Sequence, residues 1–291
     1  MSKPAISKRT FQRAREDAAT ARQTSSSPQT ESAAYRLAFQ DEEFLLREDL
    51  RPVRFQLELL KPELLLDEAE IGSTLVFYGS ARIPAPDKAD ALVAAATTDT
   101  QRRIAENLRS KSKYYDAARK LARLASEAEP DANGKRQFVV CSGGGPSIME
   151  AANRGADDVG ADSIGLNIVL PYEQLPNAYV TPSLSFQFHY FALRKMHFLL
   201  RARAVAVFPG GFGTFDEMFE LLTLIQTGKM ARLPILLFGR DFWTKVVNFD
   251  ALVAEGVVSP NDLDLIHFVE EADEAWRWIM EFYREKATAK A

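Results

Sequence analysis

Short apolar runs alternate with longer amphipathic stretches along most of the chain after residue 73. Runs rich in β-branched and aromatic residues predict strands, and apolar positions spaced three and four apart predict helices. We expect strands at residues 74–79, 138–141, 163–168, 184–188, 204–208, 233–238 and 265–268. We expect one long helix ending near residue 129, and further helices at 147–158, 190–203, 214–227, 242–255 and 271–286. This alternation predicts an α/β fold with a doubly wound, Rossmann-like parallel sheet.

The N-terminal part of the chain does not follow this alternation. It begins with a polar stretch that includes a serine- and threonine-rich linker at residues 24–30. An acidic, leucine-rich stretch at 38–66 predicts helix, with Pro52 and Pro62 expected to interrupt it. An apolar helix outside the sheet needs a surface to cover, either its own domain or a second subunit. We therefore expect a flexible polar arm, a helical N-terminal extension and a sheet domain (residues 1–34, 35–70 and 71–291).

Composition narrows the class of protein. The chain has 291 residues, is 46% hydrophobic and carries a formal net charge of −4, so we expect a sizeable core and no general attraction to nucleic acid. The apolar runs are too short to cross a bilayer and the N-terminus lacks a signal-peptide pattern. A single cysteine and three scattered histidines make a disulfide impossible within the chain and a conventional zinc site improbable. We expect a cytoplasmic protein without a metal site.

Two predicted strands run directly into glycine-rich turns that open helices. The first turn follows Cys141 and contains Gly143, Gly144 and Gly145. The second follows Phe208, contains Gly210, Gly211 and Gly213, and continues through Thr214 to Glu217. The first backbone N–H groups of a helix have no partner within the helix and lie at the positive end of its dipole, so each turn can hold a phosphate. Two such turns at one sheet edge predict a nucleotide site.

A purely structural interpretation of both turns is also open. Thr214 with Glu217, and Ser147 with Glu150, have the spacing of a capping box, in which side chains satisfy the helix terminus. Neither turn has the lysine that completes a P-loop, and the spaced glycine fingerprint of dinucleotide-binding folds is absent. Because such a turn follows two different strands and opens a helix each time, we favour nucleotide binding over bare turns.

The predicted helix at 190–203 carries a basic face beside its apolar one. Arg194, His197 and Arg201 share this face, which on most helices would be a solvated stripe. Here the helix lies one strand before the second glycine turn, so its start can approach the same sheet edge. No histidine is assigned a catalytic role, and Cys141 is expected to be a packed side chain.

Four segments together resemble the LONELY GUY family, over about residues 70–285. They are Gly79-Ser80-Ala81-Arg82, the triple glycine with Pro146 and Met149-Glu150-Ala151, the stretch from Phe191 to Arg194-Lys195, and Pro209-Gly210-Gly211-Phe212-Gly213-Thr214 with Glu217. The length resembles the longer bacterial branch. Compact members carry Met-His before the Arg-Lys pair, where this chain has Phe191-Ala192-Leu193.

The resemblance implies a cytokinin riboside 5′-monophosphate phosphoribohydrolase or a related enzyme acting on AMP, without metal or organic cofactor. It implies that Arg194 and Glu217 are catalytic. Substrate-binding positions by the same resemblance are Gly79, Ser80, Gly143, Gly144, Gly145, Lys195, Gly210, Gly211, Gly213 and Thr214. Many family members were labelled lysine decarboxylases, but this chain offers no evident Schiff-base lysine. A nucleoside 5′-monophosphate is the implied substrate, and a homodimer or larger homo-oligomer the implied assembly.

Two other classes of function are compatible with the sequence. Molybdenum-cofactor carrier proteins share the fold and use glycine loops for phosphate, so a non-enzymatic nucleotide or cofactor binder is the alternative. The pair of Arg194 and Glu217 favours the enzyme, because a carrier has no need of an acid beside its anion. A nucleic-acid-binding sheet protein is disfavoured by the acidic charge balance.

Overall fold

The computed structural model describes residues 11–171 and 175–288. Its contacts divide the chain after Leu57 into two compact units. The first ten residues of the predicted polar arm lie outside the described ranges. The rest of the first unit contains helix α1 (Ala14–Ala21), short 3-10 turns and helix α2 (Glu42–Leu45). Asp41 caps α2 by accepting a hydrogen bond from the Phe44 N–H at 3.2 Å.

Helix α3 (Arg51–Glu68) continues from the first unit into the second. The prediction that Pro62 interrupts this helix was wrong, because the helix runs through it. Pro52 lies in the first turn, where a missing N–H costs nothing. Pro62 lacks the N–H that would bond the carbonyl of Glu58, four residues earlier. That carbonyl instead lies 3.0 Å from Nε2 of His197, so the position stays hydrogen-bonded.

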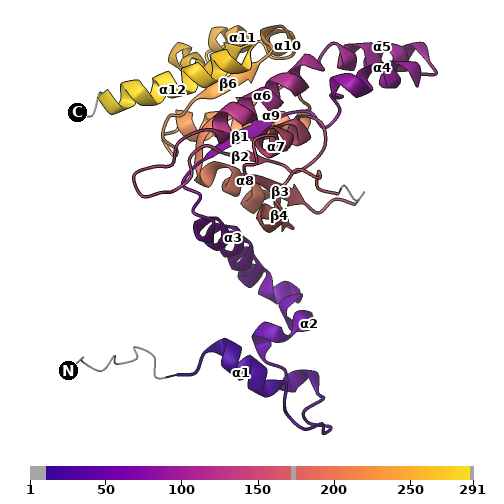
Figure 1. Ribbon diagram of the computed structural model, residues 1–291, viewed down its shortest axis with the longest axis vertical. Coiled ribbons are helices and arrows are strands. Elements are labelled where there is room, and N and C mark those ends of the chain that lie inside the picture. The colour runs from indigo at the N-terminus through magenta and orange to yellow at the C-terminus, as the bar shows by residue number, and fades with distance from the viewer. Residues whose placement is uncertain (1–10, 172–174, 289–291) are drawn as a thin grey trace. The chain divides into compact units, whose positions relative to one another are not determined.

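A parallel sheet forms the centre of the second unit (Figure 1). Within the described residues it has seven strands in the order β4-β3-β2-β1-β5-β6-β7. The strands are β1 (Thr74–Tyr78), β2 (Val139–Ser142), β3 (Ser163–Ile168), β4 (Ser185–Phe188), β5 (Ala202–Val207), β6 (Ile235–Phe238) and β7 (Ile266–Val269). Every neighbouring pair is parallel. The predicted α/β fold with a doubly wound sheet is confirmed.

Helices cover both faces of the sheet. On one face, α6 (Lys113–Ser126), α7 (Ile148–Asp157) and α12 (Ala272–Thr288) pack on alternate strand residues such as Leu75 and Phe77. On the other, the end of α3, α8 (Phe191–Leu200), α9 (Phe212–Gln226) and α10 (Arg240–Val246) cover Val76 and Tyr78. This alternation of strand side chains between two covered faces explains the continuous apolar strands of the sequence. No helix in the described ranges has the length and apolarity needed to cross a membrane.

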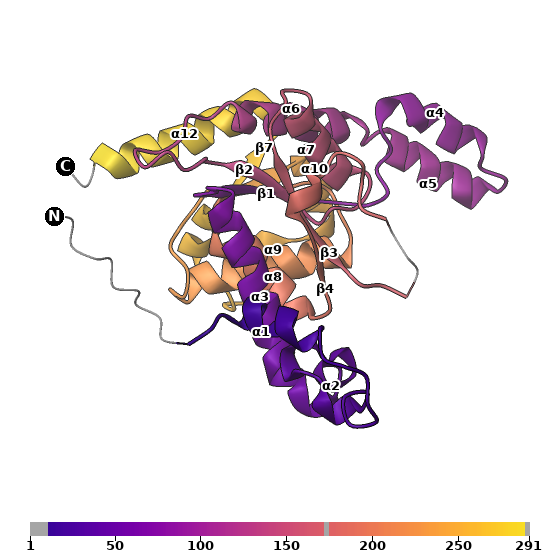
Figure 2. The same ribbon diagram turned by 60° about the horizontal axis from the view of Figure 1, so that its bottom comes forward.

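Two predicted helices are interrupted. The long helix expected to end near residue 129 is three helices, α4 (Pro86–Ala94), α5 (Asp99–Arg109) and α6. Thr98 starts α5 with a capping box to Gln101, a local signal that outweighs helix continuity. The α4–α5 hairpin projects from the sheet in both ribbon views (Figure 2). The helix expected at 242–255 is α10 and α11 (Phe249–Ala254), because Asn248 caps a new helix through the Ala251 N–H.

Helices α6 and α7 approach closely at Gly155. A Cβ added there would lie 2.2 Å from the backbone oxygen of Arg119. Gly155→Ala is therefore expected to lower the free energy of unfolding by about 1–3 kcal/mol, because the helices must move apart. Chemical denaturation of both proteins measures this difference. Gly213→Ala is the matched control, since Gly213 is also helical but a Cβ there meets open space. Equal stability of Gly155→Ala and the parent protein would contradict the expectation.

The order of the strands places a switch point between β1 and β5. The chain leaves β1 toward β2, β3 and β4 on one side, and returns to β5 on the other side of β1. Ligands of doubly wound sheets bind outside the carboxyl ends of the strands at such a point. The loops that follow β1 and β5 meet there, where the Ser80 N–H donates to the Pro209 carbonyl at 3.1 Å.

Candidate functional site

A cavity of about 810 Å³ opens at this switch point. It is lined by the loop after β1, by Gly143 after β2, by Arg194 of α8 and by the first turns of α9. Of the predicted site residues, those that line it are Gly79, Ser80, Gly143, Arg194, Gly211, Gly213, Thr214 and Glu217. Four segments far apart in the sequence thus meet in one cavity.

The start of α9 presents free space and backbone amides to the cavity. Gly211 is the N-cap residue, and the first intrahelical hydrogen bond runs from the Phe215 N–H to the Gly211 carbonyl. The amides of residues 212–214 therefore precede the hydrogen-bond ladder of the helix. A Cβ added at Gly211 or Gly213 would meet no atom within 4 Å. Amides, dipole and open space together make a site suited to an anion.

The capping-box interpretation of both glycine turns was wrong. Thr214 is not the N-cap residue of α9, which begins two residues earlier at Phe212. Ser147 is the N-cap of α7, but its hydroxyl donates to the Ile83 carbonyl instead of capping the helix. Glu150 accepts a hydrogen bond from the Tyr115 hydroxyl at 2.8 Å. The acids at both loops are thus engaged by other elements and not by their own helix termini.

Glu217 pairs with Arg194 across the cavity wall. Arg194 Nη1 lies 3.2 Å from Glu217 Oε1, and only 11% and 14% of the two side chains are exposed. Arg194 Nε donates to the Leu166 carbonyl at 2.7 Å, and the guanidinium lies 4.9 Å from the centre of the Phe198 ring. These contacts fix the direction of the guanidinium, which leaves the second Glu217 oxygen for other partners.

The triple-glycine turn is shaped around this arginine. A Cβ at Gly143 would lie 2.7 Å from Arg194 Nη2, so a side chain there would displace the guanidinium. Gly144 has φ +71°, a conformation that favours glycine, and an added Cβ would collide with Asn167. The Gly144 N–H donates to Ser142 Oγ at 3.0 Å. The turn therefore packs closely against the Arg194 guanidinium and leaves no room for a side chain at Gly143.

An amide side chain from a distant loop holds the same turn. Asn177 Nδ2 donates to the carbonyls of Gly144 and Gly145, at 3.1 and 2.9 Å, and to Asn153 Oδ1. Asn153 is fully buried and also bonds Ser142 and Ser163. Such buried, connected polar groups keep a turn in one conformation. Neither asparagine was expected from sequence, because an asparagine inside a helix (Asn153) or in a loop (Asn177) carries no specific signal for such a network.

Lys195 points to the outer side of α9. Its Nζ lies 3.0 Å from Asp216 Oδ1 and 3.1 Å from Glu220 Oε2, and it does not line the cavity. Burial alone would lower the pKa of Lys195, but the bonds to the two carboxylates outweigh it and raise the pKa. A Schiff-base lysine requires the opposite, a lowered pKa. Gly144, Gly145 and Gly210 also lie outside the cavity lining, and their contact with a ligand stays a prediction.

Aromatic and aliphatic side chains make up much of the remaining wall. They are Phe77, Tyr78, Met149, Phe198, Phe212, Phe215 and Val246, with Arg82 beside them. Arg82 and Met149 belong to the motifs already noted in the sequence. Val246 comes from the end of α10, and no sequence signal connects it with the glycine loops. Among the described residues no group of three or more His, Cys, Asp or Glu side chains could hold a metal ion.

Burial raises the pKa of Glu217 from its ordinary value of 4.5 to about 7, although the Arg194 guanidinium acts in the opposite direction. A folded-state pKa above the unfolded one means that the fold binds the proton more tightly. The contribution to stability is then complete below about pH 4.5 and is lost as pH rises toward 7.

A pH dependence of stability follows from this pKa. Between pH 5 and 8, Glu217 is expected to remove on the order of 3 kcal/mol of unfolding free energy. Glu217→Gln cannot ionise, so the Tm difference between this variant and the parent should grow as pH rises through that range. Thermal denaturation at several pH values measures it. A constant difference would show that Glu217 ionises freely in the fold.

Fold and site together define a doubly wound α/β protein with an acid–arginine pair and a glycine-flanked helix terminus at its switch point. A family model described as "Possible lysine decarboxylase" matches residues 149–279. Cytokinin riboside 5′-monophosphate phosphoribohydrolase LOG2 of Arabidopsis thaliana is 28% identical over 175 residues, 56% of this chain and 78% of that protein. LOG3 of the same plant is 26% identical over 175 residues, 59% of this chain and 77% of that protein. These matches confirm the resemblance to the LONELY GUY family, at low identity.

Solved structures that align with this chain include molybdenum cofactor proteins. The molybdenum cofactor binding protein of Rippkaea orientalis is 16% identical, with a TM-score of 0.42, and the match covers 72% of this chain and 98% of that one. The Moco carrier protein of Chlamydomonas reinhardtii is also 16% identical, with a TM-score of 0.41, covering 73% and 99%. Similarity at this level does not transfer a ligand to this chain.

Proposed function

We propose that this protein hydrolyses the N-glycosidic bond of purine nucleoside 5′-monophosphates, releasing adenine or an N6-substituted adenine and ribose 5-phosphate. The observation that carries the proposal is Glu217, a buried acid held by Arg194 one helical turn beyond the open amides of α9. The named activity of the Arabidopsis relatives supports the same class of reaction.

The 5′-phosphate is expected to bind at the start of α9. Its negative charge suits the amides and the dipole, and Gly211 and Gly213 leave room for it. Glu217 lies four residues after Gly213, just over one turn, or about 6 Å along the axis. A phosphate at the helix terminus would therefore place the ribose near this carboxylate. Binding energy from the phosphate is then used to position a bond that the phosphate does not touch.

The chemistry requires an ionised Glu217. As the bond between C1′ and the purine nitrogen breaks, positive charge develops on the ribose, and a carboxylate beside C1′ stabilises it. Water adds to C1′ and loses a proton toward Glu217, while the purine leaves with the bonding electrons and takes up a proton. The pKa of about 7 places Glu217 near the ideal value for a base at neutral pH.

Arg194 serves this carboxylate by orienting it and favouring its ionised form. Its guanidinium bonds Glu217 with Nη1 and the main chain with Nε, so it is held on both sides. Removal of Arg194 would leave a buried acid without its partner, which would raise the pKa of Glu217 and lower the fraction of the acid that is ionised at neutral pH. In this assignment the main role of Arg194 is to orient and ionise Glu217, and any contact of Arg194 with phosphate or purine is an additional role.

Incubation with AMP tests the proposal directly. Chromatography should detect adenine and ribose 5-phosphate, and adenosine, which lacks the phosphate, should react far more slowly. A screen across purine and pyrimidine monophosphates would then define the base. Tight binding of a nucleotide or of molybdenum cofactor with no base released from any monophosphate would overturn the proposal and favour a carrier.

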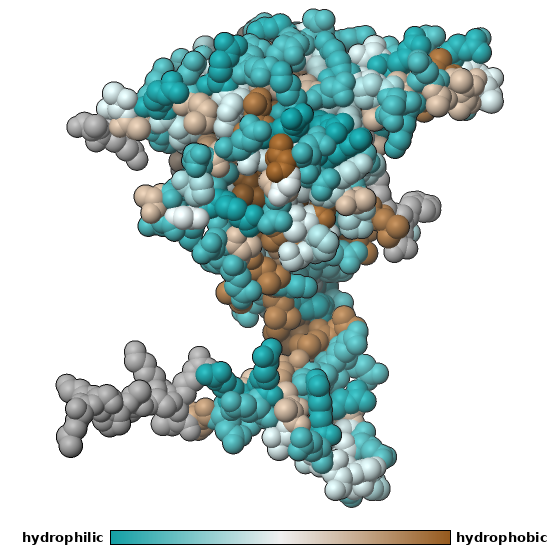
Figure 3. All heavy atoms as spheres, in the orientation of Figure 1, coloured by the Kyte–Doolittle hydropathy of each residue, from teal (hydrophilic) through white to brown (hydrophobic). Residues whose placement is uncertain are grey.

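We further propose that copies of this chain associate through exposed apolar side chains. Leu60 and Leu64 of α3 are 52% and 58% exposed, and Met196 and Leu200 of α8 are 45% and 44% exposed. Figure 3 shows apolar side chains along α3. Exposed apolar groups one helical turn apart are typical of surfaces that a partner covers. Light scattering of the parent and of a Leu60→Lys, Leu64→Lys variant would detect the assembly and its loss.

A further inference from the structure

Polar contacts join the end of α3 to α8, the helix that carries Arg194. The contacts follow the same order along both helices, beginning with Glu58 and ending with Asp67 on α3. All of these residues belong to the second unit. This pairing was not predicted from the sequence, since the basic residues of α8 were compatible with a solvated stripe.

Glu58 holds the connection between β4 and α8. Its two carboxylate oxygens accept hydrogen bonds from the N–H groups of His189, at 2.8 Å, and Tyr190, at 3.2 Å. Tyr190 is the N-cap residue of α8. A carboxylate at this position also lies at the positive end of the helix dipole, and this interaction stabilises the start of the helix. One side chain of α3 thus fixes the first residue of α8.

The main chain of the same residue makes a second link. Pro62 cannot donate to the Glu58 carbonyl, so that oxygen is available to His197 Nε2 at 3.0 Å. His197 is 5% exposed and lies one turn beyond Arg194 on α8. The proline that the sequence predicted to break α3 therefore frees the acceptor that joins α3 to α8.

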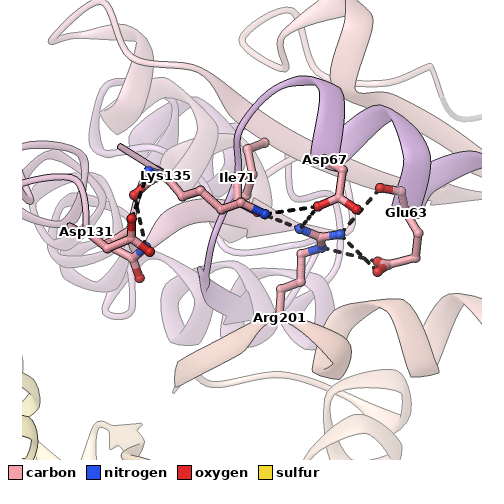
Figure 4. A network of polar contacts seen from close by, with 7 residues as sticks. Glu63, Asp67, Ile71, Asp131, Lys135 and Arg201 are labelled. Atoms are coloured by element: carbon pink, nitrogen blue, oxygen red, sulfur yellow. Dashed lines mark hydrogen bonds and ion pairs between the residues drawn. The ribbon is translucent and has the colours of Figure 1, made fainter. Parts of the chain in front are cut away.

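Arg201, the C-cap residue of α8, anchors the other end (Figure 4). Its guanidinium lies 3.0 Å from Glu63 Oε2 and 3.3 Å from Asp67 Oδ1, and Nη1 donates to the Ile71 carbonyl at 2.6 Å. Its side chain is 13% exposed. Helix α8 is consequently attached to α3 at its N-cap, in its last turn and at its C-cap.

We propose that Glu58 is a positioning residue for Arg194, acting through the first turn of α8. The Arg194 N–H donates to the Tyr190 carbonyl at 3.1 Å, so the turn that Glu58 fixes is the turn that carries the arginine. Glu58 itself does not line the cavity. The consequence for turnover rests on the proposed function, whereas the consequence for the Arg194–Glu217 pair does not.

The test measures the pKa of the Glu217 carboxyl in the Glu58→Ala variant. In protein labelled with ¹³C-glutamate, the Glu217 carboxyl signal is assigned by its loss in Glu217→Gln and titrated with pH. We expect the pKa of Glu217 to rise above the parent value in Glu58→Ala, because Arg194 is no longer held against it. We expect kcat for adenine release to fall about 10- to 100-fold, with a smaller change in KM. Glu58→Gln keeps an acceptor oxygen and should recover part of both effects.

Glu63→Ala is the matched control, because it removes an acid of α3 that bonds the far end of α8. It should lower Tm without moving the titration of Glu217. An unchanged Glu217 titration in Glu58→Ala, with Tm lowered as in Glu63→Ala, would overturn the proposal. If Glu58→Ala does not fold, Glu58→Gln is titrated and the same criterion applies. Should the parent release no adenine, the proposed function fails, and the titration still decides whether Glu58 positions Arg194.

Discussion

Replacing Glu217 with glutamine is expected to reduce kcat for adenine release from AMP by about 10³-fold or more, corresponding to about 4 kcal/mol of lost transition-state stabilisation. The amide has nearly the shape of the acid and can still accept a hydrogen bond from Arg194. It cannot carry the negative charge that opposes the developing charge on the ribose, nor take a proton from water. Initial rates measured by chromatography of adenine, with AMP at saturation, give the change directly.

Binding of AMP should survive this substitution. The phosphate contacts lie at the start of α9, one turn away from Glu217, so calorimetry should give a Kd within about tenfold of the parent. Glu220→Gln is the matched control, because Glu220 lies on the same helix but pairs with Lys195 outside the cavity. A Glu217→Gln variant as active as Glu220→Gln would remove Glu217 from the mechanism while leaving the reaction itself in place.

The sheet could be predicted from the sequence because its strands are apolar on both faces. Residues 74–78 are buried without exception, which produces the continuous run without charged residues, rich in β-branched and aromatic side chains, that indicates a central parallel strand. Helix ends were harder to predict. Thr98 and Asn248 start new helices with side-chain caps inside stretches of continuous helical periodicity. Hydrophobic periodicity predicts which face of a helix is buried, but it does not predict where one helix ends and the next begins in a new direction.

The N-terminal extension shows a different limit. Proline normally interrupts a helix because its missing N–H leaves a carbonyl without a partner. At Pro62 that partner comes from His197, 135 residues later in the chain by number. A rule based on neighbouring residues cannot predict this contact, because His197 is far away in the sequence. The same holds for Glu58, whose importance depends on amides of the β4–α8 connection.

The candidate site was partly predictable for a related reason. Glycine turns after apolar strands are local signals, and the order of strands brings them to one edge. The family resemblance named Arg194 and Glu217 as catalytic, but it did not predict the contact between them, which joins two helices. Local spacing left a capping box open as an alternative for Glu217, because its neighbours permit that interaction. The fold instead begins α9 at Phe212, which turns the acid toward the arginine.

Replacing Gly213 with aspartate is expected to weaken AMP binding by at least about 100-fold while leaving the fold at least as stable as the parent. Gly213 is the second residue of α9, and a Cβ there would meet no atom within 4 Å. An acidic side chain in the first turn of a helix is favourable, and replacing a helical glycine lowers the entropy of the unfolded chain. The new carboxylate would lie among the amides proposed for the phosphate, excluding it by occupancy and by charge repulsion.

Gly213→Ala separates occupancy from charge repulsion, because it adds a Cβ at this position without adding a charge. It should raise the free energy of unfolding by about 0.5–1 kcal/mol and weaken AMP binding less than the aspartate does. Calorimetric titration with AMP and thermal denaturation, carried out on both variants, measure affinity and stability independently. Since the two quantities are expected to move in opposite directions in Gly213→Asp, loss of binding cannot be attributed to loss of the fold. Unchanged AMP affinity in Gly213→Asp would mean that the phosphate does not lie at the start of α9, and the placement of the ribose beside Glu217 would then lose its support.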